Sequence, residues 1–304
     1  MYEECLEGLD IKEDGIYLDM TVGGFGHGRG ICERLSEKGT YIGFDLDSEA
    51  LGRAEAGRDG LRCRVELVHD NFHNFEEHLG RLGIEKVDGI LADLGVSSFQ
   101  IDEADRGFSF MREGPLDMRM DRDAPVSAYD IVNGYSREEL AGVIREYGEE
   151  QYAWNISGAI VREREISPIS TTAQLAAVIE KSVPAKYRRT SGKNVATKTF
   201  QALRIETNGE IAGLRETVDA FIDRLSPGGR LCIISFHSLE DRAVKEVFAE
   251  RAKGCICPKD FPVCVCGRKP EIKLISRGAM KAAGRELEDN PRSRSARLRI
   301  CEKI

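Results

Sequence analysis

The chain has 304 residues, 41% of them hydrophobic and 32% charged, with a formal net charge of −8 at pH 7. This composition is typical of a globular protein, and the length predicts one large domain or two smaller ones. No apolar run reaches the roughly 18 residues that a membrane span needs, and no export signal opens the chain. The sequence therefore predicts a cytoplasmic protein without a membrane partner.

A glycine-dense turn follows the first predicted strand. Residues 16–19 form a short apolar strand, the turn covers 23–28, and a second strand over 41–45 ends in Asp45. Glycine lets a backbone approach a nucleoside, and an acid after the second strand can hold ribose hydroxyls. The turn lacks the Gly-x-Gly-x-x-Gly spacing of dinucleotide sites. We therefore expect a ligand without a pyrophosphate, such as S-adenosylmethionine (SAM).

Two further strands continue the α/β pattern, at 65–69 and 89–93. Strands that alternate with helices form a parallel sheet, and right-handed crossovers bring the carboxyl ends of the strands to one edge. One acid stands at the end of each strand: Asp19, Asp45, Asp70 and Asp93. The sequence predicts a ligand site at this edge.

The pattern becomes helical after the fourth strand. Helices are expected at 136–147, 151–164, 172–181 and 193–208, and two of them begin with capping boxes, Ser136 with Glu139 and Thr171 with Gln174. We place an inserted helical domain at 102–210. Residues 1–101 and 211–304 then form the α/β domain.

The α/β pattern resumes with an amphipathic helix at 214–225 and a turn at 226–229. Three more strands are expected, at 230–236, 271–276 and 297–301. Seven strands with this order predict the class I SAM-methyltransferase form of the Rossmann-like sheet, interrupted by the all-helical domain.

Several segments together resemble one family. The matching stretches are 17–28, 88–100, 106–121, 199–208, 235–242 and 290–299. They run almost end to end and resemble the RsmH/MraW family, the bacterial 16S rRNA cytosine-N4 methyltransferases. The resemblance implies methyl transfer from SAM to the exocyclic N4 amine of a cytidine in the decoding region, at the ribosomal P site. The implied partner is 16S rRNA or the small ribosomal subunit, with the inserted domain recognising RNA.

The chain departs from the family at two places. In the glycine turn, Phe25 stands where the family usually has glycine, and Gly28 where it usually has serine. The printed chain also opens at Met1, without the His-containing segment that usually precedes the first helix in this family.

The expected cofactor site includes Phe25 and uses the backbone N–H groups of Gly26 and His27 for the methionyl carboxylate of SAM. Asp45 suits the ribose. Phe72 is expected either to stack on adenine or to pack in the core. The resemblance adds Asp93 and Gln100 as residues lining the cofactor.

Asp93 is the first candidate for the catalytic acceptor. The lone pair of a cytosine N4 amine is delocalised, so an acceptor for an N4 hydrogen would help to localise it. Asp117 and His237 are alternatives. Asp117 could instead form an ion pair with Arg112 or Arg119.

Two basic segments interrupt an otherwise acidic chain. The first, 181–204, includes Lys186, Arg188, Arg189 and Lys193, and the second, 292–299, includes Arg292 and Arg294. Such clusters can bind RNA phosphates, although solvated basic faces remain an alternative.

The chain has nine cysteines, and four of them form two Cys-x-Cys pairs: Cys255 with Cys257, and Cys264 with Cys266. Four thiols at this spacing are candidate zinc ligands, and the alternative is a loop with free thiols.

Three other functions stay open at this point. A Rossmann dehydrogenase is disfavoured by the glycine spacing. A non-catalytic RNA-binding or ribosome assembly factor is disfavoured by the intact series of strand-end acids. A methyltransferase with a different RNA target is the third alternative.

Overall fold

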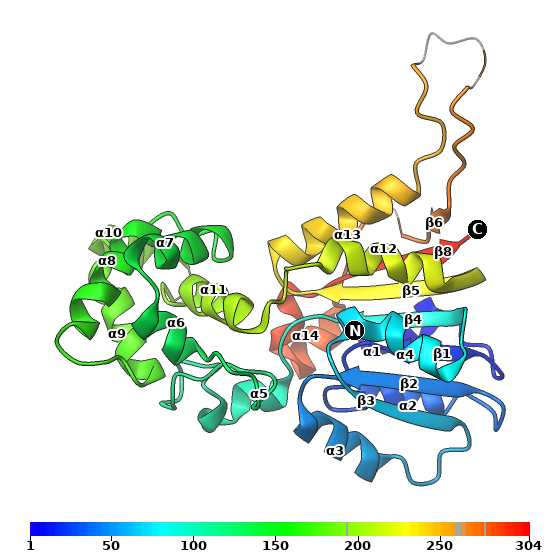
Figure 1. The fold of residues 1–304 in the computed structure, drawn as a ribbon, viewed down its shortest axis with the longest axis horizontal. Helices are drawn as coiled ribbons and strands as arrows, with labels where there is room; N and C mark the ends of the chain where they lie inside the picture. Colours follow the sequence, from blue (N-terminus) through cyan, green and yellow to red (C-terminus); the bar gives the residue numbers. More distant parts are fainter. Residues whose placement is uncertain (193, 259–262, 264, 277) are drawn as a thin grey trace. The chain divides into compact units, whose positions relative to one another are not determined.

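The structure is a computed structural model that describes residues 1–192, 194–258, 263, 265–276 and 278–304. The chain forms two compact units. One consists of Met1–Gly95 with Gly213–Ile304, and the other of Val96–Ala212. Figure 1 shows a sheet with helices in the first unit and helices in the second. No helix among the described residues is long and apolar enough to cross a membrane.

The first unit is built on a mainly parallel sheet, and the seven predicted strands are confirmed. The sheet has the order β3-β2-β1-β4-β5-β8-β6, parallel from β3 to β5 and antiparallel beyond. A short strand that the sequence did not predict, β7, pairs with β8. The bounds are β1 (Ile16–Asp19), β2 (Thr40–Asp45), β3 (Arg64–His69), β4 (Val87–Asp93), β5 (Leu225–Ser235), β6 (Ile272–Leu274), β7 (Met280–Lys281) and β8 (Arg297–Lys303).

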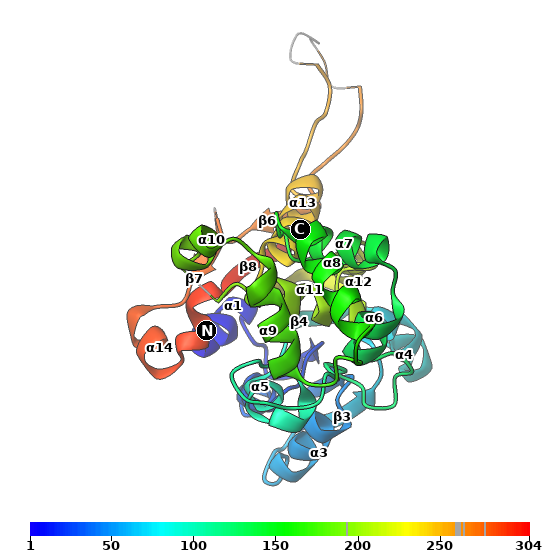
Figure 2. The same cartoon turned by 90° about the vertical axis from the view of Figure 1, so that its left-hand side faces the viewer.

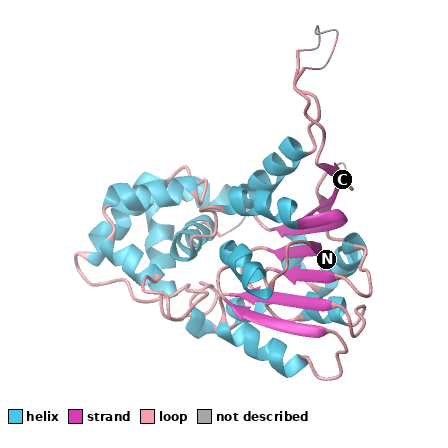
Figure 3. Cartoon of the chain, turned by 45° about the vertical axis from the view of Figure 1, so that its right-hand side comes forward, coloured by secondary structure: helices cyan, strands magenta, loops and turns pink. Residues whose placement is uncertain are grey.

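Helices cover both faces of this sheet (Figure 3). Side chains of alternate residues point to opposite faces of a sheet. Tyr17 of β1 and Tyr41 of β2 belong to the hydrophobic core that also contains residues of α1 and α2. On α4 and α12, Phe75 packs edge to face on Phe221, with ring centroids 4.9 Å apart. The helix bounds are α1 (Tyr2–Leu9), α2 (Gly26–Cys32), α3 (Ser48–Gly57), α4 (Phe75–Leu82), α12 (Leu214–Arg224), α13 (Ser238–Arg251) and α14 (Gly284–Asp289).

The predicted turn at 226–229 was wrong, because this segment lies inside β5. Val87 pairs with Leu225 and Gly89 pairs with Arg230, so β4 advances by two residues while β5 advances by five. Gly228 takes a φ of 77°, which glycine adopts without steric cost. The Pro-Gly-Gly sequence therefore bulges the strand and does not end it.

The second unit is helical (Figure 2). Both predicted capping boxes are confirmed: the N–H of Glu139 donates to Ser136 Oγ, and that of Gln174 donates to Thr171 Oγ1, each at 3.2 Å. The core contains Leu140, Ile156, Leu175 and Phe200. The bounds are α5 (Ser98–Asp102), α6 (Ala128–Gly134), α7 (Arg137–Glu146), α8 (Ala153–Arg164), α9 (Thr172–Ser182), α10 (Ala185–Thr190) and α11 (Thr197–Asn208).

Candidate active site

The strand order reverses between β1 and β4. From β1 the chain proceeds to β2 and β3 on one side, and from β4 to β5 on the other. Ligands of open α/β sheets bind at such a switch point, outside the carboxyl ends of the strands. Asp19 ends β1, Asp93 ends β4 and Asp45 ends the neighbouring β2. Three carboxylates thus lie at the strand ends where ligands of such folds bind.

Asp19 is the most deeply buried of these acids, with 1% of its surface exposed. Its carboxylate accepts hydrogen bonds from the backbone N–H of Thr21 at 3.2 Å and from the hydroxyl of Tyr41 at 2.9 Å. Burial raises the pKa of Asp19 to about 7, against the effect of these two hydrogen bonds. Asp19 therefore anchors the backbone at Thr21, just before the glycine turn.

Asp45 ties the glycine turn to β2. One oxygen accepts the N–H of Gly23 and the other accepts the N–H of Asp47, both at 2.8 Å. Burial raises the pKa of Asp45, although these hydrogen bonds oppose the shift. A carboxylate oxygen has more than one acceptor site, so Asp45 can still accept hydrogen bonds from ribose hydroxyls.

Asp93 and His27 present polar atoms with no partner. Nδ1 of His27 lies 3.7 Å from Oδ2 of Asp93. Among the described residues, Oδ1 of Asp93 and Nε2 of His27 are buried without a hydrogen-bond partner. Burial raises the pKa of Asp93, and His27 opposes the shift. Buried polar atoms are nearly always paired, so these two atoms fit a site that a polar ligand completes.

Phe25 and Gly28 have the most restricted positions in the glycine turn. Phe25 has a φ of 61°, a left-handed conformation that favours glycine, and its ring is buried against Tyr41 with centroids 5.8 Å apart. A Cβ on Gly28 would clash with the Tyr41 hydroxyl and would lie 2.7 Å from the Phe25 ring. The two rings together therefore leave no space for a side chain at position 28. A Cβ on Gly26 would meet open space, which leaves the backbone there accessible.

Phe72 and Asp70 lie near the end of β3. Phe72 is half-buried, with its ring centroid 6.3 Å from that of Phe221, which places it at the margin of the core. Asp70 accepts hydrogen bonds from Nδ2 of Asn74 at 2.9 Å and from Nε2 of His78 at 2.7 Å. Burial alone would raise its pKa, but these hydrogen bonds lower the pKa of Asp70. Both carboxylate oxygens of Asp70 thus accept hydrogen bonds from side chains of the protein, whereas Oδ1 of Asp93 does not.

Two predicted site residues belong to the helical unit. Gln100 is buried at the start of α5, where its side chain accepts the N–H of Ser97 at 3.0 Å. Both oxygens of Asp117 bind the guanidinium of Arg119, at 3.0 and 2.8 Å. Burial opposes the shift, but Arg119 lowers the pKa of Asp117. This is the ion pair that the sequence offered as the alternative to a catalytic role.

His237 caps helix α13. Its Nδ1 accepts the N–H of Glu240 at 3.4 Å, and its Nε2 lies 3.0 Å from Oε1 of Glu240. Glu240 is buried and accepts the backbone N–H groups of Phe236 and His237. The ring of His237 therefore contributes to a capping box at the end of β5.

The predicted RNA-binding residues are exposed where the structure describes them. Lys186, Arg188 and Arg189 lie on α10, and Arg292 and Arg294 lie in the 3₁₀ turn Pro291–Ser295. Lys193 lies outside the described residues.

A basic pocket extends the second of these segments. It has a volume of about 460 Å³, and five cationic side chains line it: Arg242, Lys245, Lys281, Arg294 and Arg297. Sequence reasoning missed the first three, since they come from α13 and β7. The spacing of Arg242 and Lys245, three apart on one helix face, was the available signal. Asp241 also lines the pocket and binds Arg297 and Arg299.

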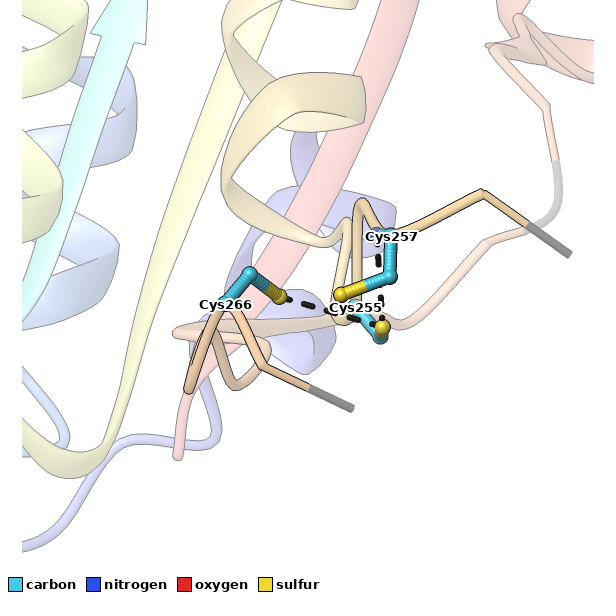
Figure 4. A group of neighbouring side chains, drawn as sticks. All are labelled: Cys255, Cys257 and Cys266. Atoms are coloured by element: carbon cyan, nitrogen blue, oxygen red, sulfur yellow. Dashed lines mark hydrogen bonds between the residues drawn. The ribbon is translucent and has the colours of Figure 1, made fainter. Parts of the chain in front are cut away.

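The predicted metal ligands lie in the segment between α13 and β6. Cys255, Cys257 and Cys266 come together (Figure 4), and Cys264 lies outside the described residues.

The chain is similar to a family model and to known proteins over its whole length. The model of the MraW methylase family matches residues 1–304. A Ribosomal RNA small subunit methyltransferase H from Clostridioides difficile (strain 630) is 49% identical over 304 residues, covering 100% of this chain and 97% of the relative. One from Finegoldia magna is 51% identical with the same coverage. The solved structure of TrmN from Thermus thermophilus aligns with a TM-score of 0.42 and 13% identity, covering 100% of this chain and 48% of that one.

The family match spans the whole chain, and the two relatives share about half of its residues. The strand-end carboxylates, the glycine turn and the sheet order fit a SAM site at the switch point. The chain therefore belongs to the MraW methylase family and is a SAM-dependent methyltransferase.

Proposed function

We propose that this chain transfers the methyl group of SAM to the N4 amine of a cytidine in the decoding region of 16S rRNA, at the P site of the small ribosomal subunit. The names of the relatives support a substrate in small-subunit rRNA. The resemblance to the cytosine-N4 methyltransferases supports the atom and its position. The single observation that carries the chemistry is the buried, unpartnered carboxylate oxygen of Asp93 at the switch point.

Charge favours SAM over a dinucleotide at this edge. Burial raises the pKa values of Asp19, Asp45 and Asp93, so carboxylate charge here is costly until a cation approaches. The sulfonium of SAM provides that positive charge and supplies an electrophilic methyl group, whereas a pyrophosphate would add negative charge. Asp45 would hold the ribose hydroxyls. The first N–H groups of α2 have no partner within the helix, so Gly26 and His27 would hold the methionyl carboxylate.

Asp93 is the proposed acceptor for the target amine. As the N4 nitrogen forms its bond to the methyl carbon, the carbon–sulfur bond would break, the neutral thioether would leave and N4 would lose a proton. An ionised Asp93 would accept a hydrogen bond from N4, localise the nitrogen lone pair and take up the released proton. His27, 3.7 Å away, favours the ionised form. Asp117 is less suited to this role, because both of its oxygens already bind Arg119.

Two basic surfaces would bind the rRNA backbone. One is α10, with Lys186, Arg188 and Arg189, and the other is the basic pocket of the α/β unit. Phosphate contacts give affinity and orientation without reading sequence. Because the net charge of the chain is −8, these local surfaces are needed to attract a polyanion. The target cytidine must also leave its stack to reach the strand ends.

The test replaces Asp93 by asparagine, which keeps the shape of the side chain but cannot become an anion. Small subunits from a strain that lacks this methylation are incubated with SAM, and N4-methylcytidine is measured by nucleoside mass spectrometry. We expect the rate to fall by about 100-fold or more, the usual range for loss of a general base. SAM affinity, measured by calorimetry, separates loss of chemistry from loss of binding.

Asp70→Asn is the matched control, since Asp70 also follows a strand but has its oxygens bound to Asn74 and His78. We expect this variant to retain methyl transfer. Near wild-type turnover in Asp93→Asn would remove Asp93 from the mechanism. Transfer to a different atom or nucleotide by the wild-type chain would contradict the proposed substrate.

A further inference from the structure

Three thiols converge away from the active site. Cys255, Cys257 and Cys266 lie in the segment that leaves α13 after Arg251 and returns to β6 at Ile272, and its two stretches run side by side (Figures 1 and 2). Their sulfur atoms all lie within 4.8 Å of one another (Figure 4). Cys255 and Cys257 come from the outgoing stretch and Cys266 from the returning one. The cluster therefore joins two parts of the segment.

Backbone N–H groups near these thiols donate hydrogen bonds to the sulfur atoms. The N–H of Cys257 donates to Sγ of Cys255 at 3.4 Å, and the N–H of Val265 donates to Sγ of Cys257 at the same distance. The N–H of Ile256 donates to Sγ of Cys266 at 3.5 Å. Each of the three sulfur atoms is thus in contact with a backbone N–H. These backbone N–H groups hold the three sulfur atoms in position beside one another.

The sulfur separations match a known coordination geometry. Zinc binds thiolate sulfur at about 2.3 Å in a tetrahedron, which places neighbouring sulfurs about 3.8 Å apart. The sulfurs of Cys255 and Cys266 are 3.8 Å apart. One ion can therefore contact all three sulfurs after small adjustments, and the fourth position of the tetrahedron is left for another ligand.

The other cysteines that the structure describes have a different environment. Cys5, Cys32, Cys63, Cys232 and Cys301 are buried in the α/β unit and serve as small apolar side chains. Cys255 is exposed, and Cys257 and Cys266 are partly exposed. Three thiols gathered at a surface without an apolar core around them do not contribute packing, so their convergence needs another explanation.

We propose that Cys255, Cys257 and Cys266 bind one zinc ion that clamps the base of this segment. Each thiol releases its proton to solvent as its sulfur binds the metal. Two hydrogen bonds already join the two stretches near α13. The N–H of Glu271 donates to the carbonyl of Arg251 at 2.9 Å, and the side chain of Arg268 donates to the carbonyl of Glu250 at 2.7 Å. The zinc ion would add a further link between the same two stretches. The site is structural and independent of the methyl-transfer chemistry.

The test measures zinc in the full chain, purified without chelator and under reducing conditions, by plasma mass spectrometry. We expect about one zinc per chain, and we expect Cys255→Ser and Cys266→Ser to lose most of it. Val265→Ser is the matched control, because it introduces the same residue beside Cys266 at an exposed side chain and leaves every thiol in place. This control should retain zinc.

Cobalt replacement gives a second readout that does not depend on how the variants fold. Cobalt bound to the wild-type chain should show a thiolate-to-cobalt charge-transfer band, and zinc should displace it. A reduced wild-type chain that neither carries zinc nor produces this band would overturn the proposal. So would full zinc content in a Cys255→Ser, Cys266→Ser double variant, or a disulfide between these two residues in protein prepared without oxygen.

Discussion

The aspartates at the strand ends and the aspartates bound to arginine lie in contrasting environments. Asp19 and Asp93 end neighbouring strands, and burial raises their pKa values. Asp117 and Asp241 bind arginines, which lower their pKa values although burial opposes the shift. The protein supplies the compensating charge for the second pair, whereas the first pair lacks full compensation within the chain. This difference separates carboxylates whose charge is balanced by a neighbouring arginine from carboxylates whose charge is disfavoured by burial.

Asp19 offers the largest test of this contrast through the pH dependence of stability. Its pKa rises to about 7 in the folded chain from an ordinary value of 3.8, so the folded state holds a proton that the unfolded state has lost. The chain therefore loses stability from this group as the pH rises from about 4 to about 7, by at most about 4 kcal/mol.

Asp19→Asn removes this titration and keeps acceptors for Thr21 and Tyr41. We expect its free energy of unfolding, relative to wild type, to be higher at about pH 8 than at about pH 5 in urea denaturation. Asp70→Asn is the control, because a lowered pKa gives a contribution that is constant over this range and is lost only in stronger acid. A parallel pH response of both variants would mean that Asp19 does not titrate as proposed.

Asp45 tests whether the strand-end acids serve a ligand. Replacing it by alanine removes acceptors for ribose hydroxyls and releases the N–H of Gly23 from its anchor. We expect SAM affinity to fall by about 10- to 100-fold, which corresponds to the 1.5–3 kcal/mol of hydrogen bonds to a charged group. Calorimetric titration with SAM measures this change. Unchanged affinity in a folded Asp45→Ala variant would place the ribose elsewhere.

Asp117 tests the role of the aspartates that are bound to arginine. Asp117→Ala leaves the partly buried guanidinium of Arg119 without its bidentate partner. We expect a loss of about 1–3 kcal/mol in the free energy of unfolding, measured in urea. Alanine at Asp105, an exposed aspartate of the same unit, should change stability by less than about 0.5 kcal/mol. Equal effects of the two substitutions would show that the Asp117 ion pair contributes nothing specific.

Much of the fold could be predicted because its signals are local. The apolar strands, the two capping boxes and the helices α7, α8, α9 and α11 follow from residue patterns within a few positions of one another. The Pro-Gly-Gly segment was misread because a turn and a bulge share residue types. Only the pairing of β5 with β4 distinguishes them, and that pairing joins residues more than a hundred positions apart.

The site could be predicted only in part for the same reason. The positions of Asp19, Asp45 and Asp93 at strand ends follow from the α/β pattern. The basic pocket does not follow from this pattern. Its residues Arg242, Lys281 and Arg294 are dispersed along the chain and meet only through the pairing of β5, β7 and β8. The lack of space for a side chain at Gly28 also depends on where the rings of Tyr41 and Phe25 pack.

The sequence alone determined the alternation of strands and helices, the glycine turn and the spacing of the cysteines, since each depends on neighbours along the chain. Tertiary structure decided which charges are compensated. Asp241 meets Arg299 from 58 positions away, while Asp93 keeps a buried oxygen without a partner among the described residues. Burial and pairing depend on distances in space between residues that are far apart along the chain, and these distances are not fixed by the local sequence.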